Sequence, residues 1–93
     1  MQNELLDLST SYQYEKVIDE ARKLMKKKNH DYGDSWRQMR QTTITDQMLV
    51  KIHRVVQIEM SNRQEISDSI RNEYLDILNY AVFGIIKLDE EKK

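Results

Sequence analysis

The sequence contains no cysteine and no proline, and its only glycines are Gly33 and Gly84. The lack of cysteine excludes disulfide bridges and metal sites built on thiolates. A fold rich in strands needs turn residues at regular spacing, and this chain has almost none of them. These absences favour an all-α fold.

Long apolar runs and an excess of charge of one sign are missing as well. No stretch approaches the ~20 apolar residues that a membrane-spanning helix needs. Charged residues make up 33% of the chain, yet the net charge is only −1, whereas general nucleic-acid binding requires a basic excess. The first residues, MQNELLDLSTS, lack the basic-then-apolar pattern of a signal peptide. We therefore expect a cytoplasmic protein that binds neither membranes nor nucleic acids in general.

The length of 93 residues fits one domain. We assign it residues 1–93, with an N-terminal extension at 1–10 and a flexible tail at 89–93. A domain of this size buries only a modest fraction of its surface, and no disulfide compensates for its thin core. We therefore expect a homo-oligomer, in which a second subunit completes the core.

Apolar residues recur at helical spacing in three segments. They predict helices over about 11–29, from 43 or 45 to 62, and from 61 or 67 to 88, packed as an antiparallel three-helix bundle. Thr43 or Thr45 would cap the second helix, and Ser61 with Gln64 has the spacing of a capping box for the third. The residues expected to face inward are, helix by helix, Tyr14, Val17, Ile18, Ala21, Leu24 and Met25; Met48, Leu49, Ile52, Val55, Val56 and Met60; and Ile66, Ile70, Tyr74, Ile77, Leu78, Ala81, Val82, Ile85 and Leu88.

Residues 29–45, NHDYGDSWRQMRQTTIT, have no sustained apolar period. We predict a structured loop here, with a helical turn over 36–39 and with Gly33 in a backbone conformation that other residues avoid. Loops of this length in a compact domain are usually either functional or disordered, and Trp36 and Tyr32 argue against disorder because both favour burial. Trp36 or Tyr32 either stacks on a base, as aromatic side chains do in single-strand binders, or belongs to the core.

Three carboxylates form a candidate metal set. Glu59 lies within the apolar face of the second helix and near its C-terminus, where the helix dipole disfavours an acid. Glu73 and Asp76 follow a polar strip of the third helix together with Ser69 and Tyr80. Oxygen ligands of this kind suit Mg²⁺. In the alternative interpretation, Glu59 bends out to solvent and the strip is an ordinary solvated helix face.

Four cations are candidate phosphate ligands, namely Lys28, Arg37, Lys51 and Arg54. Lys28 continues the inward stripe of the first helix, while Lys51 and Arg54 lie on a flank of the second. Arginine binds phosphate as a planar fork and lysine as a point charge. Alternatively, Lys28 packs its stem and reaches water, and Lys51 and Arg54 pair with the carboxylates of the third helix. The sequence has no P-loop, no dinucleotide fingerprint and no nucleophile–base set.

Three segments resemble the nucleotide modification associated domain 1 family of bacteria and phages: KKNHDYGDSWRQMR (27–40), ITDQMLVKIHRVVQIE (44–59) and SDSIRNEYLDILNYAVFGIIKL (67–88). The resemblance rests on the block DYG-x-x-W-R, followed by TDQ and K-x-x-R, and then by E-Y with N-Y six residues later. It implies a link to nucleotide chemistry. Since relatives often carry two copies of the domain, it also implies an assembly of several copies. The characteristic polar positions are Asp31, Tyr32, Gly33, Trp36, Arg37, Lys51, Arg54, Glu73 and Asn79.

A looser likeness is to the MazG-type all-α nucleoside triphosphate pyrophosphohydrolases. Those enzymes hold magnesium between an ExxE on one helix and an ExxD on the next. Glu73 and Asp76 match the ExxD, but the second helix of this chain offers only Glu59.

These observations lead to three hypotheses of function. The first is a module that binds a nucleotide or a nucleotide-derived phosphate ligand and that would sequester a signalling nucleotide in a phage. The second is a magnesium-dependent nucleoside triphosphate pyrophosphohydrolase with Glu59, Glu73 and Asp76 as metal ligands. The third is a non-catalytic interaction module, favoured if residues 31–36 are fully packed in the core. The candidate ligand-binding residues are Lys28, Asp31, Tyr32, Trp36, Arg37, Lys51, Arg54 and Asn79.

Overall fold

The computed structural model describes residues 9–61 and 67–92. Within these ranges the chain forms three α-helices and one short 3-10 helix, without any strand. The elements are α2 (Thr10–Tyr32), η1 (Ser35–Gln38), α3 (Gln41–Met60) and α4 (Ser67–Glu91). The predicted all-α class, its three helices and the helical turn near Trp36 are confirmed. The predictions for residues 1–8, Gln64 and Ile66 lie outside the described residues.

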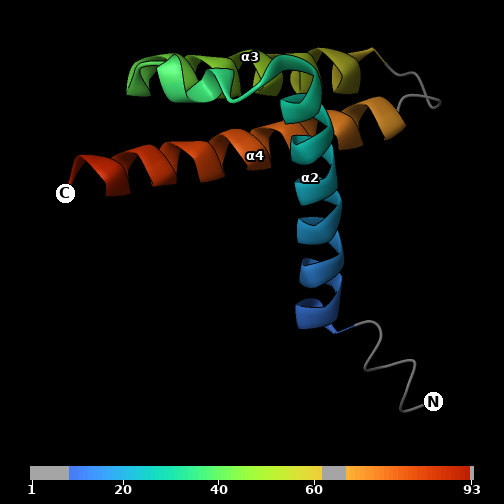
Figure 1. Cartoon of the computed structure of the whole chain (residues 1–93). Coiled ribbons are helices and arrows are strands. Elements are labelled where there is room, and N and C mark those ends of the chain that lie inside the picture. Colours follow the sequence, from blue (N-terminus) through green and yellow to red (C-terminus); the bar gives the residue numbers. More distant parts are fainter. Residues whose placement is uncertain (1–8, 62–66, 93) are drawn as a thin grey trace.

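Two of the helices form a pair and the third crosses it. α3 and α4 run antiparallel and side by side, and α2 stands steeply across them (Figure 1). α2 packs on α4, while its N-terminal part extends away from the pair. None of the described helices is both long and apolar enough to cross a membrane.

Local signals set both ends of α2. Ser9 is its N-cap, and the Oγ of Ser9 accepts a hydrogen bond of 3.2 Å from the backbone N–H of Tyr12. Gly33 ends the helix with φ of 70°, a left-handed angle that costs glycine little because it has no Cβ. The N–H of Gly33 donates to the carbonyl of Asn29 at 2.7 Å. The prediction for Gly33 is confirmed, although the helix ends later than predicted.

The start of α3 differs from the prediction, because neither Thr43 nor Thr45 is its N-cap. The helix begins at Gln41, and Arg40 occupies the cap position without a side-chain hydrogen bond. The Nε2 of Gln41 donates to the carbonyl of Gly84 on α4 at 3.1 Å. Packing against α4 therefore decides this helix start, and the connection between α2 and α3 is shorter than residues 29–45.

The buried apolar core of the described residues is small, and it draws on every element. Its members are Ala21, Trp36, Ile44, Val55 and Leu75. Many residues that were predicted to face inward are exposed instead. The apolar stripes of α3 and α4 are wider than one neighbouring helix covers, and the N-terminal part of α2 extends away from the pair (Figure 1). These exposed residues are Tyr14, Val17, Leu49, Ile52, Val56, Met60, Tyr74, Val82, Ile85 and Leu88.

Candidate functional site

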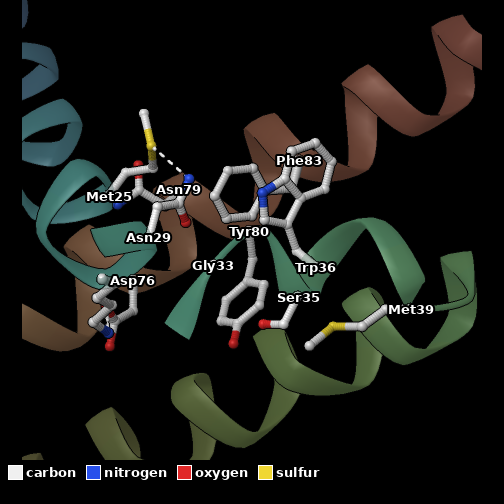
Figure 2. A pocket seen from close by; sticks show the side chains of 11 residues that line it. Met25, Asn29, Gly33, Ser35, Trp36, Met39, Asp76, Asn79, Tyr80 and Phe83 are labelled. Carbon is white, nitrogen blue, oxygen red and sulfur yellow. Dashed lines mark hydrogen bonds and ion pairs between the residues drawn. The ribbon is translucent and has the colours of Figure 1, made fainter. Parts of the chain in front are cut away.

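A cavity of about 340 Å³ lies between the C-terminal end of α2, η1 and α4 (Figure 2). This volume is near the lower end of the range for small-molecule sites. Asp76 lies at one end of the lining and Met39 toward the other (Figure 2). The polar lining residues are Lys28, Asn29, Ser35, Asp76, Asn79 and Tyr80, and the apolar ones include Met25, Trp36, Met39 and Phe83.

Asp76 is the buried charge of this site, and it joins all three helices. Its Oδ1 accepts a hydrogen bond from the Nζ of Lys28 on α2 at 2.8 Å, and its Oδ2 lies 3.0 Å from the Nζ of Lys51 on α3. Burial raises the pKa of the Asp76 carboxyl, but the hydrogen bonds and charges of Lys28 and Lys51 outweigh it, so that the pKa lies below its ordinary value of 3.8. Asp76 is therefore ionised at neutral pH.

The charge network continues from Lys51 to the next carboxylate of α4. Lys51 Nζ lies 4.0 Å from Glu73 Oε2, and Arg54 Nη1 lies 3.8 Å from Glu73 Oε1. The predicted alternative, in which the two cations of α3 pair with α4, is confirmed. With Lys28, three cations meet two carboxylates, which leaves one positive charge in excess.

The cations differ in how well a ligand can reach them. The side chain of Lys51 is 15% exposed and its residue does not line the cavity, whereas the side chain of Lys28 is 49% exposed and does. Arg54 is also largely exposed, outside the cavity lining. Lys28 is therefore the cation that can contact a ligand in the cavity while the rest of the network stays in place.

The aromatic wall is built from α4 and η1. The rings of Trp36 and Phe83 stack with centroids 4.3 Å apart, and the ring of Tyr80 meets Phe83 edge-on at 6.2 Å. The guanidinium carbon of Arg37 lies 4.4 Å from the centroid of the Trp36 ring. Because Trp36 is also only 6% exposed, its ring belongs to the core, and stacking of Trp36 on a base is not supported.

Arg37 is engaged by its own neighbours. Its Nε lies 3.3 Å from Asp34 Oδ2, and its Nη1 lies 3.2 Å from Glu90 Oε2 near the end of α4. The residue does not line the cavity at Lys28. Its guanidinium ties η1 to α4, which is an architectural role. Glu90 belongs to α4, which continues to Glu91, beyond Leu88 where the third helix was predicted to end.

Two asparagines orient the polar lining. The Nδ2 of Asn79 donates to the carbonyl of Ala21 in α2 at 3.0 Å, and the Nδ2 of Asn29 donates to Asp34 Oδ1 at 2.6 Å. Both amides are thus held by neighbouring protein groups at the cavity. Asn79 was predicted as a site residue, but Asn29 and Phe83 were not. Phe83 follows Asp76 and Tyr80 at helical spacing, so the continuation of that strip was the signal that could have found it.

Other predicted site residues lie elsewhere. Glu59 is exposed, and the described residues hold no group of three histidine, cysteine, aspartate or glutamate side chains that could bind a metal. The predicted set of Glu59, Glu73 and Asp76 is therefore not brought together, because Glu59 lies on a different flank of α3 from Lys51. Asp31 is exposed and lies 3.3 Å from the Nδ1 of His30, outside the cavity lining. The side chain of Tyr32 lies outside the described part of the chain.

Most of the chain matches a known protein family. Residues 28–88 match the sequence model of the nucleotide modification associated domain 1 family. The match covers more than half of the chain, and the chain belongs to this family. The matched segment begins at Lys28 and includes the whole charge network. No curated protein and no solved structure matches the chain.

Proposed function

We propose that this chain binds a nucleotide or a nucleotide-derived phosphate ligand in the cavity beside Lys28. The observation that carries the proposal is the excess of one positive charge in the network of ion pairs. This network borders a cavity that is lined by both polar and aromatic side chains. A phosphate would supply the charge that this network lacks. The name of the family, nucleotide modification associated domain 1, supports a ligand of this class.

The cavity offers a different kind of contact to each part of such a ligand. The ammonium of Lys28 binds the phosphate at the polar end, where Asp76 holds its position. Asn79 and Tyr80 provide amide and hydroxyl groups for hydrogen bonds to a sugar or a base edge. The ring of Phe83 contributes apolar wall, as ligand pockets commonly require.

Magnesium-dependent hydrolysis has less support from this geometry. Both carboxylate oxygens of Asp76 bind lysines, and Glu59 is not part of the site. A metal at Asp76 would have to compete with Lys28 and Lys51, whose positive charges repel it. A magnesium cofactor therefore stays a prediction from the sequence.

The interaction-module hypothesis is favoured if residues 31–36 are fully packed in the core. Trp36 is buried, but Asp31, Gly33, Asp34 and Ser35 are exposed. The segment thus borders an open cavity, which favours a small ligand over this hypothesis.

Isothermal titration calorimetry with mononucleotides, dinucleotides and cyclic nucleotides tests the proposal. We expect saturable binding of at least one phosphate-bearing compound and none of the matching nucleoside. Release of intact ligand after the complex is denatured would indicate sequestration. Phosphate or pyrophosphate release that EDTA abolishes would indicate the hydrolase instead. No heat with any compound would refute ligand binding.

A further inference from the structure

The α3–α4 pair has an apolar flank that no described part of the chain covers. On α3 it contains Leu49, Ile52 and Val56, which are 48%, 43% and 44% exposed. On α4 it contains Tyr74, Ile85 and Leu88, which are 56%, 59% and 47% exposed, with the half-buried Ile77 and Ala81 between them. We call these eight residues the α3–α4 apolar face.

Helical geometry places all eight residues on one side of the pair. With 100° per residue, Ile52 and Val56 lie about 100° and 140° around α3 from Lys51, which faces α4. Ala81 and Ile85 lie about 100° and 140° in the same sense from Tyr80, which lies between Asp76 and Gly84 on the side of α4 that faces α3. Because the helices are antiparallel (Figure 1), equal rotations from their contact line lead to the same side.

This side is turned away from α2. The contacts of α4 with α2 come from its other flank, where Asn79 donates to the carbonyl of Ala21. The charge network also reaches α2 there, through the ion pair of Lys28 with Asp76. The α3–α4 apolar face and the proposed ligand cavity are therefore separate surfaces.

The single chain exposes more surface than a folded monomer of its mass. Its accessible area is 7637 Å², whereas a compact monomer of 11.2 kDa exposes about 5,700 Å². The radius of gyration of 15.9 Å likewise exceeds the ~12 Å of a compact domain of this length. The excess area is more than twice the ~800 Å² that each partner buries in an interface of standard size, and part of it belongs to the N-terminal part of α2, which extends away from the pair (Figure 1).

We propose that the α3–α4 apolar face binds the same face of a second copy of this chain. Two such two-helix layers, packed face to face, form a four-helix bundle around a shared apolar core. A two-fold interface uses one patch twice, and none of the eight members of this face is charged. The exposed carboxylate of Glu59 lies on the same flank, near the C-terminal end of α3. On α3 its helical spacing also continues the stripe that buries Val55 within one chain.

Analytical ultracentrifugation of the wild-type chain and three variants tests this interface. The wild type should sediment with twice the mass of 11.2 kDa. Ile52→Lys and Ile85→Lys each place a charge in the interface, and each should weaken dimerisation by about 30-fold or more. Val50→Lys is the matched control, since Val50 is 44% exposed on the opposite flank of α3 and Ile52 is 43% exposed. Circular dichroism should show the same helix content in all four proteins.

Three results would overturn the proposal. If the wild type stays monomeric at every concentration, the face binds a different partner or is covered by another segment of the same chain. A dimer that survives both Ile52→Lys and Ile85→Lys would use another surface. Equal loss of the dimer in Val50→Lys would likewise show that the α3–α4 apolar face is not the interface. Because the cavity lies on the other flank, nucleotide binding by the monomeric variants distinguishes failure of the interface from failure of the ligand proposal.

Discussion

The indole ring of Trp36 lies parallel to the phenyl ring of Phe83, with 4° between their planes. The pair attaches η1 to α4, so the wall of the cavity and the packing of the α2–α3 connection depend on the same contact. Trp36 is also one of the few apolar side chains that are buried. A change at this position therefore affects both the stability of the domain and the shape of the cavity.

Trp36→Ala should lower the free energy of unfolding by about 3–5 kcal/mol, because it removes a large buried ring and leaves a void against Phe83. Urea denaturation followed by circular dichroism measures the loss. Tyr14→Ala is the control, since Tyr14 is 63% exposed and its change should lie within about 0.5 kcal/mol. Similar stability of the two variants would contradict the role of the Trp36 ring in the core.

Asp76 should make the stability of the fold depend on pH at the acid end. Its pKa in the folded chain lies below the ordinary value of 3.8 because Lys28 and Lys51 outweigh the effect of burial. The folded state thus binds this proton less readily than the unfolded state does. The stabilisation is complete above the ordinary pKa and is lost as the pH falls through the folded value.

Asp76→Asn should remove that acid dependence and lower the free energy of unfolding at pH 7 by about 1–3 kcal/mol. Denaturant titrations of both proteins from pH 7 down to acid pH measure the effect. Asp31→Asn is the control, because Asp31 is exposed and lies outside the network. An unchanged pH profile in Asp76→Asn would mean that the carboxylate is not held by the lysines.

Lys28→Ala should weaken binding of any phosphate ligand about 10-fold or more, because it removes a charge-assisted hydrogen bond of about 1.5–3 kcal/mol. Lys27→Ala is the matched control, since Lys27 is exposed and does not line the cavity. Calorimetry with the ligand identified for the wild type measures both variants. Equal affinities in the two variants would exclude Lys28 from phosphate binding.

Gly33→Ala should lower the free energy of unfolding by about 1 kcal/mol, because a φ of 70° strains any residue with a Cβ. No atom would obstruct the added Cβ, so the cost comes from the backbone alone. Gly84→Ala offers the contrast. Its Cβ would meet Gln41 Nε2 at 3.4 Å and Ile44 Cγ2 at 3.7 Å, while alanine favours the helix by about 1 kcal/mol. Thermal denaturation should show a loss for Gly33→Ala and none for Gly84→Ala.

The sequence predicted the candidate site only in part. Lys28 and Asn79 were identified and line the cavity, and Asp76 was identified as a metal ligand although it binds two lysines instead. Glu59 was wrongly grouped with it. A helical repeat tells which residues share a face, but it does not tell which neighbouring helix, if any, meets that face. The sequence offered the pairing of Lys51 and Arg54 with α4 only as an alternative, and the tertiary structure decided in its favour and added Lys28 as a partner of Asp76.

By itself, the sequence determined the local structure: three helices from apolar spacing, the unusual backbone angle of Gly33, and the helical turn at Trp36. These features follow from backbone preferences and side-chain periodicity within a few residues. Only the tertiary structure decided where α3 starts and that the flank with Ile52 and Ile85 is exposed. It also decided that Asp76 forms ion pairs with both Lys28 and Lys51. Each of these depends on how α2 crosses the α3–α4 pair, and that angle is set by contacts between residues far apart in the chain.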